Sequence, residues 1–142
     1  AVSSELLKLG ANFRDLTAHT MRNKSLASLK LWGRALERLR LDPAKGIAVT
    51  VLRHADFSEC GAEPDDAEGV ASLLNHLADV KMSMLLRELP DGTVKGSLRT
   101  THELIDVSQI AKLMGGGGHA KAAGFTVRGR ITETEHGWKI IE

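Results

Sequence analysis

Several features that are common in proteins are missing from this sequence, and each absence excludes a class of protein. The sequence contains a single cysteine, Cys60, which excludes a disulfide within the chain and a metal site built from several cysteines, and which suits a reducing compartment. No stretch approaches the ~20 consecutive apolar residues that a transmembrane helix needs. The first apolar segment is short and interrupted by charges, unlike a secretory signal. We therefore expect a soluble, cytoplasmic protein without a membrane partner.

A large excess of charge is also missing. With 19 basic and 18 acidic residues, the formal net charge is +1, so the overall electrostatics do not favour binding to duplex DNA, and any contact with nucleic acid must be local. Arg34, Arg38 and Arg40 cluster near the end of a predicted helix, where cations suit the helix dipole. A solvated helix face explains this cluster better than a nucleic-acid interface does.

The histidines do not form a metal-binding motif. The six histidines are scattered singly, without the His-x-His, HExxH or Asp-x-Asp spacing typical of metal sites. They are His19, His54, His76, His102, His119 and His136. The sequence therefore predicts no metal site in this chain, and it leaves the roles of His54, His76 and His102 open.

Residues 1–45 are predicted to form a helical connector, with helix as far as residue 41. A first helix ends at Gly10, a second begins after Asn12, and a longer one begins after Ser25, whose hydroxyl can cap it. In the third helix, apolar residues recur at spacings of three and four, as on the buried face of an amphipathic helix. These residues are Leu26, Leu29, Trp32, Leu36 and Leu39.

From residue 46 onward the pattern becomes that of an α/β domain. The elements expected, in chain order, are a buried strand at 47–52, a helix at 64–77, a strand at 80–86, a turn at 90–92, the second strand of an antiparallel hairpin at 93–100, a short helix capped by Asp106, and a strand at 125–128. Residues 131–142 are too mixed to assign. The predicted fold class is α/β, with a mixed β-sheet flanked by helices in residues 46–142 and preceded by the helical connector.

The hairpin's second strand carries polar side chains on one face. Alternation along the strand places Lys95, Ser97 and Arg99 together, opposite Val94 and Leu98. A solvated outer face would show the same pattern, so the alternation alone does not identify a site.

Met114–Phe125 contains the most informative pattern in the sequence. Four consecutive glycines cost backbone entropy on folding, but they let a ligand approach the backbone closely and leave its N–H groups available. His119 and Lys121 follow on a short Ala-rich stretch that could open a helix. Backbone amides, a helix N-terminus and two cationic side chains together indicate an anion site, most plausibly for phosphate. A flexible linker is the alternative, but little sequence remains for it to connect.

Ser97–Phe125 resembles the C-terminal DHH-associated domain of the DHH phosphoesterases, and within them the branch of oligoribonucleases and 3′-phosphoadenosine-5′-phosphate (pAp) phosphatases. In that branch a Gly-Gly-Gly-His element is followed by Ala-Ala-Gly-Phe, and weaker similarity extends back to about Ser25. The resemblance implies a substrate-binding domain in which Arg99 and His119 contact phosphate, with Ser97 beside the glycine loop. It also implies backbone N–H donors and a cation at the rim of the site, namely Gly116, Gly117, Gly118 and Lys121.

The resemblance also implies a catalytic half that this chain lacks. DHH phosphoesterases bind two divalent metals, typically manganese, through an Asp-His-His motif and further aspartates in an N-terminal domain, and this chain has no His-His pair. The sequence begins at Ala1 without a methionine, and we expect it to be cut from a longer protein. We expect the chain to hold short RNA or a nucleotide without hydrolysing it, to partner that catalytic domain, and to allow a homodimer.

Two other assignments remain open. The C-terminal domain of alanyl-tRNA synthetases shares this element and binds RNA without hydrolysing it, although it typically lacks the histidine after the glycines. A RecJ-like exonuclease is the second alternative. A dinucleotide-binding Rossmann domain is excluded because GGGGH differs from GxGxxG and follows a helix instead of a first strand.

Overall fold

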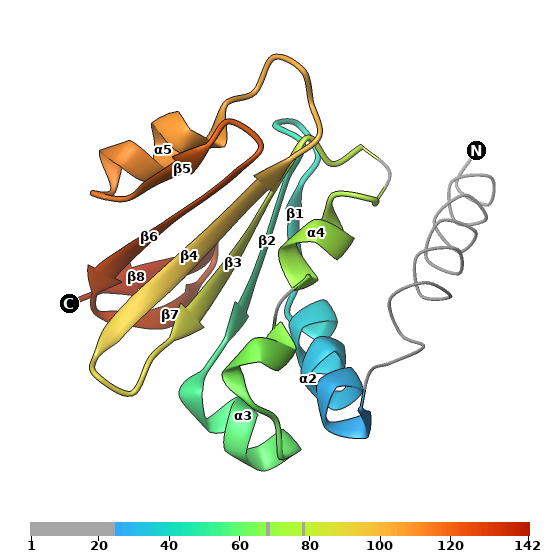
Figure 1. Ribbon diagram of the computed structural model, residues 1–142, viewed down its shortest axis with the longest axis vertical. Coiled ribbons are helices and arrows are strands. Elements are labelled where there is room, and N and C mark those ends of the chain that lie inside the picture. The colour runs from blue at the N-terminus through green and yellow to red at the C-terminus, as the bar shows by residue number, and fades with distance from the viewer. Residues whose placement is uncertain (1–24, 68, 78) are drawn as a thin grey trace.

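A computed structural model describes residues 25–67, 69–77 and 79–142, and these form a mixed α/β fold (Figure 1). The strands are β1 (Arg40–Asp42), β2 (Ile47–Leu52), β3 (Met82–Glu88), β4 (Thr93–Thr100), β5 (Gly117–His119), β6 (Ala122–Arg128), β7 (Arg130–Thr134) and β8 (Gly137–Ile141). The helices are α2 (Leu26–Glu37), α3 (His54–Cys60), the 3-10 turn η1 (Pro64–Ala67), α4 (Val70–Leu74) and α5 (Val107–Leu113). The predicted α/β class is confirmed.

Six strands form one sheet in the order β1-β2-β3-β4-β6-β5, and β7 and β8 form a separate two-stranded sheet. The β2–β3 pair is parallel and every other neighbouring pair is antiparallel. Helices α2, α3 and α4 lie on one face of the large sheet, whereas α5 and the β7–β8 hairpin pack on the other. Each face therefore has its own apolar core, centred on Leu31, Leu52 and Leu74 on one side and on Val94, Leu98 and Phe125 on the other.

Helix α2 begins where the sequence predicts, because the Ser25 hydroxyl accepts a hydrogen bond from the Ser28 amide at 3.1 Å. Its buried residues are Ser28, Leu31, Trp32 and Ala35. Of the predicted face, Trp32 is buried and Leu36 and Leu39 pack against the same core, whereas Leu26 is exposed. The helix also ends earlier, at Glu37. Arg40 and Leu41, predicted as helix, belong to strand β1, which pairs with β2 through a turn closed at Gly46. The helices predicted before Ser25 lie outside the described residues.

Three further elements differ from the sequence prediction. The helix predicted over residues 64–77 is divided at Gly69, whose φ of +87° is a left-handed conformation that separates η1 from α4. Helix α3 has no counterpart in the prediction. Residues 131–142, left unassigned, form most of the β7–β8 hairpin. Short elements of this kind are fixed by packing more than by local propensity, which is why sequence patterns miss them.

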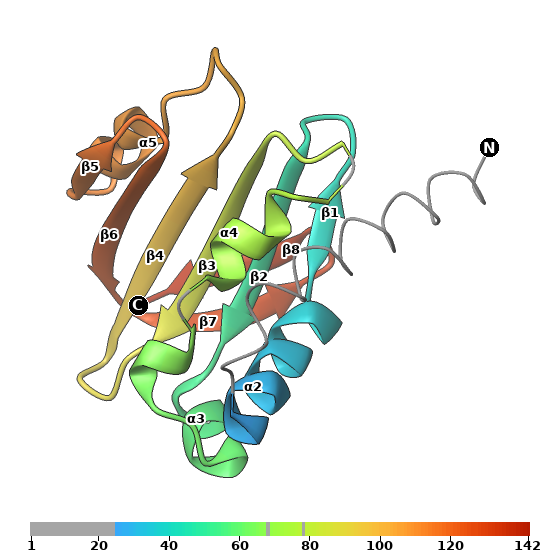
Figure 2. The same ribbon diagram turned by 45° about the vertical axis from the view of Figure 1, so that its right-hand side comes forward.

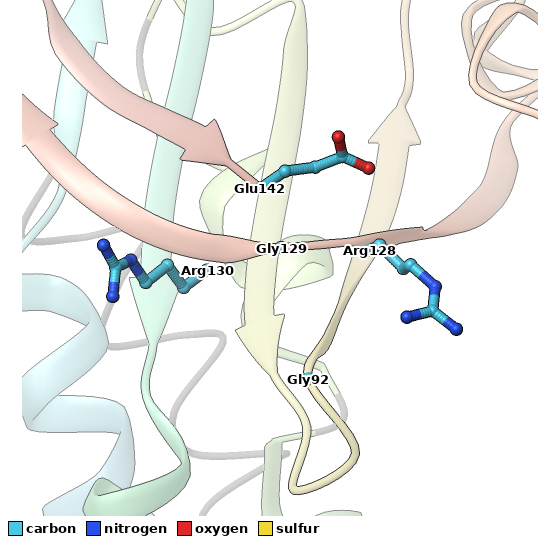
Figure 3. Close-up of a pocket in the computed structure, with 5 residues that line it drawn as sticks. All are labelled: Gly92, Arg128, Gly129, Arg130 and Glu142. Carbon is cyan, nitrogen blue, oxygen red and sulfur yellow. The ribbon is translucent and has the colours of Figure 1, made fainter.

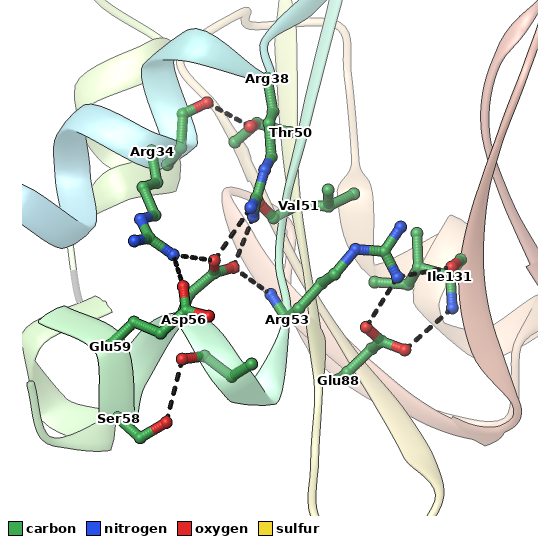
Figure 4. Close-up of polar contacts among 12 residues, drawn as sticks. Arg34, Arg38, Thr50, Val51, Arg53, Asp56, Ser58, Glu59, Glu88 and Ile131 are labelled. Atoms are coloured by element: carbon green, nitrogen blue, oxygen red, sulfur yellow. Dashed lines mark hydrogen bonds and ion pairs between the residues drawn. The ribbon is translucent and has the colours of Figure 1, made fainter.

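A buried carboxylate joins α2 to α3. Asp56 is 2% exposed and accepts hydrogen bonds from Arg34 at 2.8 Å, from Arg38 at 2.5 and 2.9 Å, and from the Arg53 amide at 2.6 Å (Figure 4). Burial raises the pKa of Asp56, but the hydrogen bonds from Arg38 and Arg34 outweigh it and lower the pKa from 3.8 to about 2. Arg34 and Arg38, two members of the arginine cluster noted in the sequence, therefore stabilise the fold.

Arg53, whose amide donates to Asp56, also attaches the β7–β8 hairpin to the large sheet. Arg53 donates hydrogen bonds to the Glu88 carboxylate at 3.1 Å and to the Ile131 carbonyl at 2.9 Å. The Ile131 amide donates in turn to Glu88 at 3.3 Å. Strand β7 is thus held at the ends of β2 and β3, on the side of the sheet that does not carry α4.

Replacing Asp56 with Asn should destabilise the fold in a pH-dependent way. Because the folded pKa of about 2 lies below the unfolded value of 3.8, the stabilisation is complete above the unfolded value and is lost as the pH falls toward the folded one. Near neutral pH we expect the free energy of unfolding to fall by about 1.5–3 kcal/mol, the range for hydrogen bonds to a charged group.

Urea unfolding at about pH 7 and about pH 3 measures this effect. The gap between the native protein and Asp56→Asn should shrink at the lower pH. Glu59→Gln is the control, because Glu59 is an exposed partner of Arg34 and its loss should cost under about 0.5 kcal/mol. A gap that is equal at both pH values would contradict this account.

Candidate functional site

The register of three neighbouring strands brings the predicted site residues onto one face of the sheet. Ser97 of β4 lies opposite Gly124 of β6, and Gly124 lies opposite Gly117 of β5. Two residues farther along each strand, Arg99 lies opposite Ala122, which lies opposite His119. Residues paired in register project from the same face of a sheet. Ser97, Arg99, Gly117 and His119 therefore share one face.

This face is only partly covered. Helix α4 packs on β3, where the Ser83 hydroxyl donates to the Ala71 carbonyl at 2.5 Å. Strands β4 and β6 extend beyond α4, and no helix of the described residues covers them on this side (Figure 2). Between α4 and β4 lies a cavity of about 430 Å³, lined by Ala67, Gly69, Ala71, Ser72, Leu85, Arg87, Lys95, Ser97 and Arg99. Ser97 and Arg99 line this cavity, whereas His119 and the glycines lie beside it, two strands farther along the same face.

The Arg99 guanidinium is available to a ligand. Among the described residues its side chain makes one hydrogen bond, at 3.3 Å to the carbonyl of the adjacent Leu98, and the side chain is half-buried. Within the described residues it forms no ion pair. A partly desolvated guanidinium attracts an anion more strongly than a fully solvated one, and its planar fork suits paired phosphate oxygens.

The residues after the glycines form a hairpin, which corrects the expected helix. His119 ends β5, Ala120 and Lys121 form the turn, and Ala122 begins β6. The predicted helix N-terminus is therefore absent from this segment. The Ala-rich composition favours helix, but pairing of β6 with β4 over residues 122–128 outweighs this local propensity.

Lys121 holds the neighbouring loop in place. Its ammonium donates to the carbonyls of His102 at 2.5 Å, Glu103 at 3.4 Å and Ile105 at 3.1 Å. The turn is further fixed by hydrogen bonds from the Thr100 amide to the Lys121 carbonyl and from the Val107 amide to the Ala120 carbonyl. Lys121 thus has a structural role at the base of the hairpin that presents His119, and its predicted contact with substrate stays a prediction.

A larger cavity lies elsewhere. Gly92, Arg128, Gly129, Arg130 and Glu142 surround about 560 Å³ at the junction of β6 and β7 (Figure 3). In Figure 3, however, Arg128 and Arg130 point away from each other. The cavity therefore does not collect converging polar groups, and the smaller cavity beside β4 is the better candidate.

Comparison with known proteins identifies the family. A model described as the DHHA1 domain matches residues 45–136. The chain belongs to the DHHA1 domain family. Over 128 residues it is 30% identical to the bifunctional oligoribonuclease and PAP phosphatase NrnA of Thermus thermophilus, covering 90% of this chain and 37% of NrnA. A stretch of 42 residues is 52% identical to oligoribonuclease NrnB of Bacillus subtilis, covering 30% of this chain and 10% of NrnB.

Solved structures agree with this assignment. An exopolyphosphatase-related protein from Bacteroides fragilis matches 91% of the DHHA1 chain and 38% of its own length, with a TM-score of 0.71 and 26% identity. A pGpG-specific phosphodiesterase, PggH, from Vibrio cholerae shares the fold with a TM-score of 0.51 and 10% identity over 72% of this chain and 33% of its own. The chain thus spans a little over a third of NrnA and less of NrnB. The predicted resemblance to the oligoribonuclease and pAp phosphatase branch is confirmed.

Each glycine of the GGGG run in this DHHA1 domain has its own structural reason. Gly115, with a φ of +82°, follows the end of α5 in a left-handed conformation. At Gly116 a Cβ would lie 2.1 Å from the Gly124 carbonyl oxygen, and at Gly118, where φ is +141°, it would lie 2.6 Å from the Ala123 Cα. At Gly117 a Cβ would meet nothing within 4 Å. The space above Gly117 is therefore the space a ligand can use.

The backbone amides of the run also divide by role. The Gly116 N–H, expected to face a ligand, donates to the Ala111 carbonyl at 2.8 Å instead. A two-residue turn makes His119 and Ala122 a hydrogen-bonded pair, and such pairs alternate along an antiparallel ladder. Gly117 therefore bonds toward β6, whereas the Gly118 N–H points to the open edge. Of the three amides predicted from the sequence, that of Gly118 is the best placed for an anion.

The other histidines of the DHHA1 domain either stabilise a loop or lie exposed on the surface. The His102 Nδ1 accepts a hydrogen bond from the Leu104 amide at 3.1 Å, which makes it a loop-stabilising residue. His54, His76 and His136 are exposed and lie away from the cavity. Among residues 25–67, 69–77 and 79–142, no three His, Cys, Asp or Glu side chains gather as a metal site. In the same ranges, no helix has the length and apolar character needed to cross a membrane.

Sequence reasoning missed Arg87 as a lining residue of this cavity. The predicted strand ended at residue 86, one position short of it, whereas β3 continues to Glu88 and pairs Arg87 with Lys95. The signal that could have located Arg87 is the hairpin turn predicted at residues 90–92. Counting backward from that turn places position 87 opposite position 95.

Substituting neighbouring glycines of the run should have opposite consequences. Gly116→Ala should lower the free energy of unfolding by about 2 kcal/mol or more, because its Cβ would collide with backbone. Gly117→Ala should fold with a stability within about 0.5 kcal/mol of the native protein, yet it should weaken ligand binding by occupying the open space. Chemical denaturation and a binding titration of both variants measure this. Equal destabilisation by both would contradict the assignment of space above Gly117.

Proposed function

We propose that this DHHA1 domain binds the substrate of a DHH-type, metal-dependent phosphoesterase that hydrolyses short oligoribonucleotides or nucleoside 3′,5′-bisphosphates. The observation that carries the proposal is the β4–β6–β5 register, which gathers Arg99, Ser97 and His119 on an uncovered face next to glycines. The names of two relatives, an oligoribonuclease and a bifunctional oligoribonuclease and PAP phosphatase, support this choice of substrate.

In this proposal a phosphate group lies above the glycine end of the sheet. Arg99 donates two hydrogen bonds from its planar fork to phosphate oxygens, and Ser97 adds a hydroxyl donor two residues away. The Gly118 amide supplies a neutral donor at the strand edge. Within the described residues no hydrogen bond or ion pair holds the His119 side chain, so it is free to donate a hydrogen bond to phosphate.

In this proposal the chain's own residues bind and orient the substrate and break no bond. The described residues supply no cluster of carboxylate and histidine ligands that would fit a two-metal centre. We propose that two divalent metals, manganese in the expected case, are held by an N-terminal DHH catalytic domain of the same parent protein. The proposal includes a cytoplasmic location and allows a homodimer.

Removing Arg99 should weaken all nucleotides by a similar amount. Because the guanidinium contacts phosphate and not a base, Arg99→Ala should reduce affinity by about 1.5–3 kcal/mol for AA, CC and pAp alike. Arg130→Ala is the matched control, since Arg130 is exposed outside the proposed site. Isothermal titration of each ligand at two salt concentrations gives the values. A loss confined to one base would mean that Arg99 recognises sequence, and an equal loss in both variants would mean nonspecific charge.

The 142-residue chain by itself should not hydrolyse these ligands. Incubation with Mn²⁺ and a dinucleotide, pAp or a generic phosphodiester, followed by chromatography, should return the substrate unchanged. Turnover in a contaminant-free preparation that a chelator abolishes would contradict the division of labour between binding and catalysis.

A further inference from the structure

Two further cations lie in the same cavity, at the end away from Arg99. Lys95 of β4 and Arg87 of β3 are partners in register, and both line the cavity that also contains Ser97 and Arg99. Lys95 and Arg99 are four residues apart on one strand, so their Cα atoms are separated by about 13–14 Å. The cavity thus has a cationic group at each end and a hydroxyl, Ser97, between them.

The two cations at this end are positioned differently. The Arg87 guanidinium lies over the Phe57 ring at 5.3 Å, a cation–π contact that fixes it on the cavity wall. Lys95 is exposed, and within the described residues it has no hydrogen bond or ion pair. An anionic group above Lys95 would form an ion pair with its ammonium.

We propose that Lys95, with Arg87 beside it, forms a second phosphate subsite, and that the domain thereby favours oligonucleotides over mononucleotides. This inference rests on the proposed function, in which Arg99 holds the first phosphate. A single phosphate bound at Arg99 leaves the Lys95 end of the cavity without an anion. A chain with a further phosphate places charge at both ends, with the small side chains of Ala71, Ser72 and Ser97 leaving room between them.

The role of Lys95 is best tested by comparing ligands that carry one and two phosphates. Nuclear magnetic resonance titrations of the 142-residue chain with 5′-AMP and with pApA give both dissociation constants. Lys95→Ala should weaken pApA by about tenfold, as expected for one charge-assisted contact, and should leave 5′-AMP within about twofold of the native value. Lys139→Ala is the matched control, because Lys139 is an exposed lysine on β8, outside the cavity. It should change neither ligand.

The remaining outcomes separate this inference from the proposed function. If Lys95→Ala weakens both ligands equally, Lys95 and Arg99 hold the same phosphate and the second subsite is overturned. If it weakens neither, Lys95 is only a solvated residue and the subsite is likewise overturned. If the native chain binds neither ligand, or Arg99→Ala leaves both unchanged, the proposed function itself fails and the subsite fails with it. Arg87 is left intact because its removal would also disturb packing against Phe57.

Discussion

The candidate site depends on which residues of β6 lie opposite β4. On the side of the sheet where α4 lies, this register puts Gly124 beside Ser97 and Ala122 beside Arg99. On the other side, the same register lays the Phe125 ring where a Cβ of Gly96 would be, with ring atoms 2.2 Å from that position. A slip of one residue would expose Phe125 and turn the small residues toward the wrong face. Apolar packing on one side therefore fixes the arrangement of charge on the other.

Preorganisation follows from the same set of contacts. The hairpin that carries His119 is joined to the 102–105 loop by Lys121 and to β4 by the Thr100 amide. A ligand on this face would meet donors whose backbone is already ordered, so less conformational entropy is lost on binding. Arg53 and Glu88 hold the β7–β8 hairpin on the other side of the large sheet, so this hairpin does not cover the face that carries the site.

Local patterns were sufficient for some parts of this structure and insufficient for others. Strand β4 and the face shared by Lys95, Ser97 and Arg99 follow from alternation, and the glycine-histidine signature was specific enough to indicate the family. The hairpin at His119 could not be predicted, because its Ala-rich residues favour helix and only pairing with β4 makes them a strand. Arg87 was missed for a different reason: the predicted strand stopped at residue 86, although the turn at residues 90–92 sets the register that pairs Arg87 with Lys95.

A crystal structure of the chain with a bound dinucleotide would test the central claim most directly, namely that the uncovered face of β4, β6 and β5 holds a phosphate. The account predicts a phosphate within hydrogen-bonding distance of the Arg99 guanidinium and the Gly118 amide, above the open space at Gly117. A dinucleotide bound instead between Arg128 and Arg130, with the β4 face empty, would contradict it.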